Sequence, residues 1–140
     1  MTKTPDIIKA AALFINEKGE LLLSRDKGST KWQVLGGKIE KNEKPVETIQ
    51  REMKEELNLE VSVEHNQYAE SPIFTAANDP ELQVKLFYYF CQLQGQPELN
   101  ENVEELHWFS KEEALSGNYD LAESTRKFLI PLLIEDKILK

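Results

Sequence analysis

Short runs of apolar residues separated by turn-forming residues cover most of the chain, and this pattern predicts a protein rich in β-strands. The run at residues 84–91 is apolar on both faces, so we expect a central strand that is covered on both sides. Turn-forming residues predict a hairpin turn at 16–19 and further turns at 78–80 and 95–97. The predicted strands and extended segments, in chain order, are residues 7–15, 20–24, 32–35, 38–40, 60–64, 67–75, 82–93 and 104–109.

Helical periodicity is strongest at residues 45–57. The apolar residues there recur at spacings of three and four, as Val46, Ile49, Met53 and Leu57. The Ser-x-x-Glu pattern that starts at Ser110 is typical of a capping box and predicts a short helix through residue 115. A last amphipathic helix is expected at about 121–135, where Pro131 should bend or interrupt it. Strands, a helix, more strands and then helices predict an α/β fold with a mixed sheet between helical layers.

The composition, with 40% hydrophobic and 30% charged residues, is typical of a globular protein. We expect one domain that spans residues 1–140. The single cysteine, Cys91, excludes an internal disulfide, and with His65 and His107 it falls short of the clustered ligands of a zinc site. No apolar run approaches the roughly 20 residues that span a bilayer. We therefore expect a cytoplasmic protein without membrane contact.

The chain is acidic, with 17 Lys and Arg residues against 25 Asp and Glu residues and a formal net charge of −8. Binding to a nucleic-acid polymer depends mainly on Lys and Arg side chains that displace counterions, so a polymer partner is disfavoured. A small anionic substrate remains compatible with this charge if a few cations or a bound metal ion offset the negative field. The sequence is compatible with a monomer or a homodimer.

Three carboxylates converge on one face of the helix predicted at 45–57. On a helical wheel Glu52, Glu55 and Glu56 fall within an arc of about 100°, beside the apolar face. Like charges at these spacings repel, so the arrangement costs stability unless a cation lies among them. Hard oxygen ligands suit Mg²⁺ or Mn²⁺. The alternative interpretation is that the face is simply solvated.

The surroundings of this helix favour a functional interpretation. Gly36 and Gly37 precede it, and a glycine pair lets the backbone approach a ligand closely. Residues 37–59 resemble the signature of the Nudix hydrolases, Gly-x5-Glu-x7-Arg-Glu-U-x-Glu-Glu-x-Gly-U, where U is apolar. The matching positions are Gly37, Glu43, Arg51, Glu52, Met53, Glu55, Glu56 and Leu59. Asn58 replaces the glycine after the helix, where Asn is the next-best residue for a left-handed backbone, and Leu35 replaces a frequent proline.

The resemblance implies a Nudix-type α/β/α sandwich with a mixed central sheet, and it implies roles for individual residues. Glu52, Glu55 and Glu56 would bind divalent cations, Mg²⁺ or plausibly Mn²⁺, with the carbonyl of Gly36 as a further ligand. Glu52 would orient or deprotonate the attacking water. A salt bridge between Arg51 and Glu43 would hold the loop and the helix in register.

Other candidate residues lie outside the signature, and each also has a simpler structural interpretation. A further metal ligand could come from Glu101, Glu104 or Glu105, before the predicted strand that contains Trp108; each could instead be a solvated charge. Arg25 and Lys38 are candidates for contact with substrate phosphates or are ordinary surface cations. The candidates for a base-binding pocket are Trp32, Phe74 and Asn78, although aromatic residues in strands more often belong to the core.

The resemblance implies hydrolysis of a pyrophosphate bond. We expect a Mg²⁺-dependent enzyme of the small MutT-like type that cleaves a nucleoside triphosphate, canonical or modified, to monophosphate and pyrophosphate. One alternative is hydrolysis of another nucleoside diphosphate derivative, such as a dinucleotide polyphosphate or a nucleotide sugar. Two further alternatives are a non-catalytic nucleotide-sensing module and an interaction domain with an acidic helix.

Overall fold

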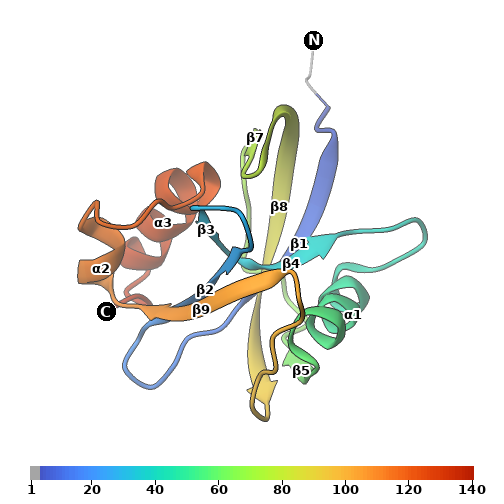
Figure 1. Cartoon of the computed structure of the whole chain (residues 1–140), viewed down its shortest axis with the longest axis horizontal. Coiled ribbons are helices and arrows are strands. Elements are labelled where there is room, and N and C mark those ends of the chain that lie inside the picture. Colours follow the sequence, from blue (N-terminus) through green and yellow to red (C-terminus); the bar gives the residue numbers. More distant parts are fainter. Residues whose placement is uncertain (1–3) are drawn as a thin grey trace.

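A mixed sheet forms the centre of the computed structural model, which describes residues 4–140 (Figure 1). Its strand order is β4-β1-β8-β5, and β1 and β8 pair in parallel while the other pairs are antiparallel. Two short strands, β6 and β7, also pair with β8. The strands are β1 (Ile7–Leu13), β4 (Leu35–Lys38), β5 (Glu60–Val63), β6 (Ala69–Glu70), β7 (Phe74–Ala76) and β8 (Asp79–Gln94).

A second, antiparallel sheet has the order β3-β2-β9. Its strands are β2 (Leu21–Asp26), β3 (Trp32–Gln33) and β9 (Val103–Phe109). Helix α1 lies on one side of the sheets, and α2 and α3 lie on the other (Figure 1). The helical segments are α1 (Pro45–Leu57), α2 (Lys111–Leu115), the π-helical turn η1 (Thr125–Leu129) and α3 (Ile130–Glu135). The predicted α/β fold with a mixed sheet between helical layers is confirmed.

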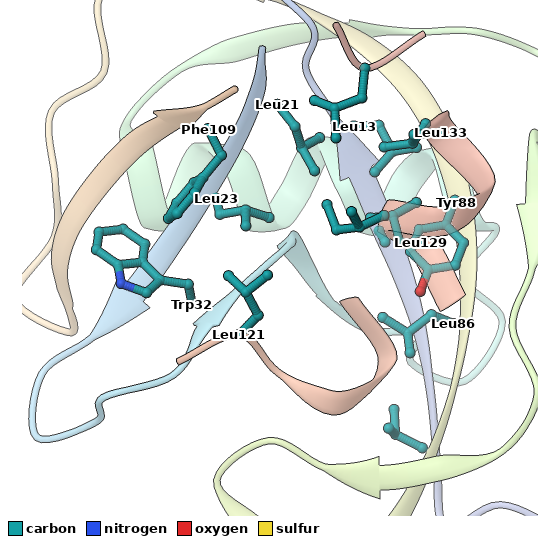
Figure 2. Close-up of a cluster of buried hydrophobic side chains, with 14 of the residues drawn as sticks. Leu13, Leu21, Leu23, Trp32, Leu86, Tyr88, Phe109, Leu121, Leu129 and Leu133 are labelled. Atoms are coloured by element: carbon teal, nitrogen blue, oxygen red, sulfur yellow. The ribbon is translucent and has the colours of Figure 1, made fainter. Parts of the chain in front are cut away.

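Strand β1 separates two hydrophobic cores. Ala10 and Ala12 belong to the core that contains Met53 of helix α1. Ala11 belongs to the other core, with Leu129 of η1, part of which Figure 2 shows. Successive side chains of a strand point to opposite faces, and the small alanine side chains let both helical layers approach β1 closely.

The ends of helix α1 follow from single residues. Pro45 occupies the first helical position, and the backbone N–H of Lys44 donates to Glu47 Oε1 at 2.9 Å. The side chain of Lys44 supplies no acceptor for the first turn of the helix. At the other end, Asn58 has φ 52° and ψ 41°, and its N–H donates to the carbonyl of Lys54 at 3.1 Å. Asn58 therefore ends the helix in the left-handed conformation that the sequence predicted.

Two predictions for the middle of the chain were wrong. The strand expected at 67–75 is divided into β6 and β7. The N–H of Ser71 still donates to the carbonyl of Leu86, but the N–H of Leu86 donates to Ser71 Oγ in place of a backbone carbonyl, and Pro72 has no N–H. The turn expected at 78–80 lies at Ala77 and Asn78, so β8 already begins at Asp79.

The prediction of a helix from Leu121 was also wrong at its start. Leu121 is extended and forms a bridge with Trp32, and helical backbone begins at Glu123. The interruption expected at Pro131 takes the form of the π-helical turn before it, in which the N–H of Ile130 donates to the carbonyl of Thr125. A proline excludes a regular hydrogen bond at its own position, and the wider turn accommodates it. No helix of residues 4–140 has the length and apolar character needed to cross a bilayer.

We expect Lys44→Ser to stabilise the protein by about 0.5 to 1.5 kcal/mol. The serine hydroxyl can accept from the N–H of Glu47, which completes the capping box, and the substitution removes a cation from the positive end of the helix dipole. Urea denaturation measures the change. Lys44→Ala is the control, because it removes the cation without supplying an acceptor. Equal stability of the two variants would contradict a capping effect.

Candidate active site

The two glycines of β4, Gly36 and Gly37, let the backbone of β4 lie close to its neighbours. Gly36 has φ +134°, and a Cβ there would lie 2.1 Å from the carbonyl oxygen of Ala10. A Cβ on Gly37 would lie 2.2 Å from the carboxyl carbon of Glu52. Gly36 thus has no room for a side chain, and any side chain at position 37 would displace that of Glu52. The side chain of Glu52 therefore lies directly against the backbone of β4.

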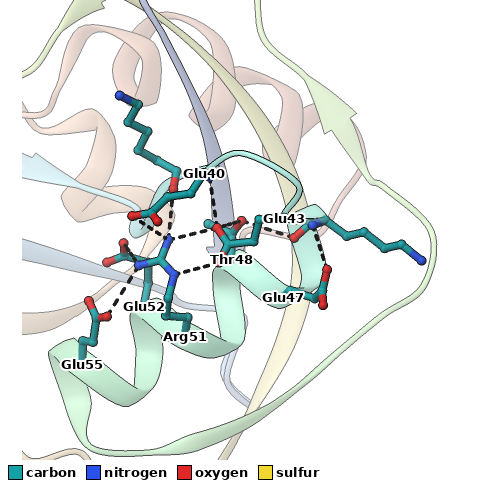
Figure 3. A network of polar contacts seen from close by, with 9 residues as sticks. Glu40, Glu43, Glu47, Thr48, Arg51, Glu52 and Glu55 are labelled. Atoms are coloured by element: carbon teal, nitrogen blue, oxygen red, sulfur yellow. Dashed lines mark hydrogen bonds and ion pairs between the residues drawn. The ribbon is translucent and has the colours of Figure 1, made fainter.

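Arg51 connects helix α1 to the loop before it (Figure 3). Its Nε lies 2.7 Å from Glu43 Oε2, and its Nη2 donates to Glu43 Oε1 at 3.0 Å. Its Nη1 lies 2.8 Å from Glu52 Oε1 and 3.6 Å from Glu55 Oε1. Nη2 also donates to the carbonyl of Lys38 at 3.1 Å. One guanidinium thus fixes the loop, the end of β4 and two of the helix carboxylates.

These contacts change the acidity of Glu43. Its Oε1 also accepts from Thr48 Oγ1 at 2.7 Å and from the backbone N–H of Glu40 at 3.1 Å. The hydrogen bonds from Arg51 and then from Thr48 and Glu40 lower the pKa of Glu43 to about 2. The hydrogen bonds to Glu43 and then to Glu52 raise the pKa of Arg51 above its already high usual value. Both groups are therefore charged throughout the neutral range.

Glu56 lies next to Glu52 but faces a pocket. Burial, followed by the neighbouring carboxylate of Glu52, raises the pKa of Glu56 well above its usual range. The negative charge of Asp26 acts in the same direction, and the positive charge of Lys9 opposes it. Two adjacent carboxylates of this kind are stable together when a proton or a cation lies between them.

The oxygen donors fit a hard divalent cation. Within residues 4–140, no three carboxylate, imidazole or thiol side chains lie close enough to form a ready-made metal site. The reason is that Arg51 binds Glu52 and Glu55, while Glu55 has an exposed side chain (58%) that points to the guanidinium. Glu52 and Glu56 are the adjacent pair that could hold the cation, and Glu55 would have to leave Arg51 to join them.

The pocket that Glu56 faces has a volume of about 110 Å³ and lies between the two sheets. Gly36, Gly37 and Glu56 all line this pocket, and Glu52 lies against Gly37 beside it. The other polar lining comes from Lys9, Ser24, Asp26, Gln33, Ser124 and Thr125. Apolar walls come from β1, β4, β8 and the segment before η1.

Arg25 does not point toward the carboxylates of helix α1. Successive residues of β2 alternate between faces, so Ser24 and Asp26 line the pocket while Arg25 points away from it. Its Nη2 lies 2.7 Å from Glu105 Oε1, and its guanidinium lies over Trp32, 5.7 Å from the ring centroid. Glu105 is thereby also engaged away from the pocket.

The expected base-binding residues do not come together either. Trp32 is buried against Phe109 in a core cluster, and Phe74 packs against the same cluster. Asn78 Oδ1 accepts from Ser29 Oγ at 2.7 Å in a separate surface hollow. The simpler interpretation of the two aromatic residues, as part of the core, agrees with these contacts.

Lys38 and the loop before β9 remain near the site. Lys38 is exposed at the end of β4, opposite Lys9 in the register of β1 and β4. Asn100 binds the end of α1, since its Nδ2 donates to the carbonyl of Glu55 at 3.1 Å. Glu101 follows it directly and, like Glu104, is exposed.

None of the six polar lining residues outside the signature was predicted from the sequence, and Lys9, Asp26 and Gln33 are the three with the longest or charged side chains. The available signal was the polar side chain of Lys9 within a predicted strand that is otherwise apolar. Asp26 and Gln33 belong to β2 and β3, and nothing in their local sequence indicates which face of the sheet meets α1.

Comparison with known proteins identifies the family. The family model described as NUDIX domain matches residues 6–131, so the chain belongs to the Nudix family. An RNA pyrophosphohydrolase of Marinomonas sp. (strain MWYL1) is 42% identical over 48 residues, which span 34% of this chain and 30% of that protein.

Two solved structures show the same fold over nearly the whole chain. The MutT protein from Methanosarcina mazei Go1 is 26% identical with a TM-score of 0.77, covering 98% of this chain and 99% of that one. The ORF135 protein of E. coli is 27% identical with a TM-score of 0.73, covering 94% and 90% of the two chains.

We expect Glu43→Gln to lower the melting temperature at neutral pH. As the pH falls, the melting temperature of the variant should decrease less than that of the wild type. The folded-state pKa of about 2 is below the usual value of 4.5, so the Glu43 charge stabilises the fold above about pH 4.5. This contribution disappears as the pH falls from about 4.5 toward 2. Melting temperatures measured across this range test the effect.

The matched control for this test is Glu17→Gln, which changes an exposed side chain in the β1–β2 hairpin turn. Its acid profile should follow that of the wild type. An identical profile for Glu43→Gln would contradict the assigned role of the Arg51 ion pair.

Proposed function

We propose that this protein is a metal-dependent pyrophosphohydrolase that cleaves a nucleoside triphosphate, canonical or modified, to monophosphate and pyrophosphate. The observation that carries the proposal is a pair of adjacent carboxylates, of which Glu52 lies against the glycine backbone of β4 and Glu56 lines a pocket. Membership of the Nudix family supports a reaction at a phosphorus anhydride.

Each residue of the site has a separate role in the proposed reaction. Glu52 and Glu56, with Glu55 and the Gly36 carbonyl, would hold Mg²⁺ or Mn²⁺. When bound, such a cation neutralises phosphate oxygens and activates water. Glu52 would orient or deprotonate the attacking water. Arg51 and Glu43 keep helix and loop in register, because their ion pair links the two elements directly.

A free nucleotide suits this chain better than an RNA end. The relative from Marinomonas bears the name RNA pyrophosphohydrolase. Binding to a nucleic-acid polymer depends mainly on clustered Lys and Arg side chains, whereas this chain has a net charge of −8. Another nucleoside diphosphate derivative is the second candidate, since the same carboxylate pair would serve it. A non-catalytic sensing role is disfavoured because every charged position of the signature is retained.

We expect hydrolysis to require Mg²⁺ and to rise from neutral toward alkaline pH. The carboxylate ligands must be ionised and the attacking water must lose a proton. Release of pyrophosphate or phosphate is measured with canonical and oxidised nucleoside triphosphates, dinucleotide polyphosphates and nucleotide sugars. Full turnover in excess EDTA would contradict the metal requirement.

We expect Glu56→Gln to lower turnover by orders of magnitude, because the bound cation supplies the electrostatic stabilisation of the transition state. Without metal the variant should be about as stable as the wild type, because the raised pKa keeps Glu56 protonated at neutral pH and glutamine is a neutral side chain of the same shape. Mg²⁺ should raise the melting temperature of the wild type by binding linkage and that of the variant much less.

Glu47→Gln is the matched control on the same helix, since Glu47 is exposed and bonds only to the backbone of Lys44. It should retain both turnover and the Mg²⁺ response. Equal rates and equal metal shifts for Glu56→Gln and wild type would remove Glu56 from the proposed ligands.

A further inference from the structure

Lys9 is the lysine that lines the pocket. It lies on β1, is partly buried and lines the pocket together with Glu56. No carboxylate of residues 4–140 forms an ion pair with it. A partly buried ammonium group has lost some of its water, so a hydrogen-bond acceptor on a ligand would compensate it.

Asp26 supplies the opposite chemistry in the same pocket. It ends β2 at a shift in the register with β9, and its Oδ2 accepts from Gln33 Nε2 at 3.2 Å. The hydrogen bond orients the carboxylate and leaves its other oxygen without a partner in the described part of the chain. Because Asp26 and Lys9 form no ion pair in the structure, each is available to a group on the ligand.

The remaining walls are apolar. Val84 and Leu86 of β8 lie on the same face of that strand, and Ala77 and Ala122 complete the apolar lining. A volume of about 110 Å³ accommodates a part of a nucleotide, not a whole one. With the phosphates at the carboxylate pair, the part inside the pocket is the heterocyclic base.

We propose that Lys9 and Asp26 determine which nucleobase the site accepts. An ammonium group only donates hydrogen bonds and a carboxylate only accepts them, so together they fix the donor and acceptor pattern that the edge of the base must present. The inference rests on the proposed function, since it assumes that the phosphates bind at Glu52 and Glu56. It adds two specificity-determining residues outside the family signature.

The test compares nucleotides whose bases exchange donors and acceptors on the same edge: CMP with UMP, and AMP with IMP. Their dissociation constants are measured by calorimetry with Mg²⁺ present, which does not require turnover. In each pair that binds, we expect one member to bind roughly tenfold to hundredfold more tightly, as for a hydrogen bond to a charged group. Ribose 5-phosphate, which lacks a base, should bind at least about tenfold more weakly than the better member.

Two substitutions then assign the discrimination. Asp26→Asn and Lys9→Gln replace a group of fixed polarity by an amide, which both donates and accepts. Each should reduce the preference within a pair to about threefold or less. Lys41→Gln, at an exposed loop position, is the control and should keep the wild-type preference. Circular dichroism verifies that all variants are folded.

The outcomes separate this inference from the proposed function. Equal binding within both pairs, no binding of any monophosphate, or an unchanged preference in both pocket variants would overturn the role of Lys9 and Asp26. Loss of affinity for ribose 5-phosphate in Lys9→Gln would instead assign Lys9 to the phosphates and also overturn it. Selective binding without Mg²⁺-dependent hydrolysis would leave the inference standing and reject the proposed function.

Discussion

The guanidinium of Arg51 binds the loop before α1, the end of β4 and the carboxylates of α1 at the same time. A planar group with several fixed donors can satisfy all of these acceptors, whereas a lysine at this position could not. The loop between β4 and α1 has no regular structure of its own, so these bonds decide where the helix begins relative to the glycines. The close approach of Glu52 to Gly37 depends on this placement.

The same guanidinium keeps the acidic face stable when no cation is bound. It offsets the repulsion among carboxylates that would otherwise lie side by side, and it directs the exposed Glu55 toward itself. A divalent cation bound at this face would therefore compete with Arg51 for the oxygens of Glu52 and Glu55. Its affinity would depend on the difference between these two interactions.

The residues of the signature could be predicted because they lie within one short segment, where spacing alone defines helix faces and loop contacts. The position of Asn58 and the ion pair between Arg51 and Glu43 follow from such local rules. The pocket could not be predicted, because its walls come from strands that meet only in the folded sheet. Trp32 and Arg25 show the difficulty, since an aromatic or a cation near the signature can equally face the core or the opposite side of β2.

Strand β1 pairs with β8 in parallel, and residues 7–13 are joined to residues 84–90. Parallel neighbours require a long connection, and such non-local pairs form late in folding because the chain entropy of the loop must be overcome first. During synthesis from the N-terminus, β1 cannot form this pairing until β8 has been made. The pocket wall that contains Lys9, Val84 and Leu86 therefore exists only once more than half of the chain has been made, and ligand binding reports on completed folding.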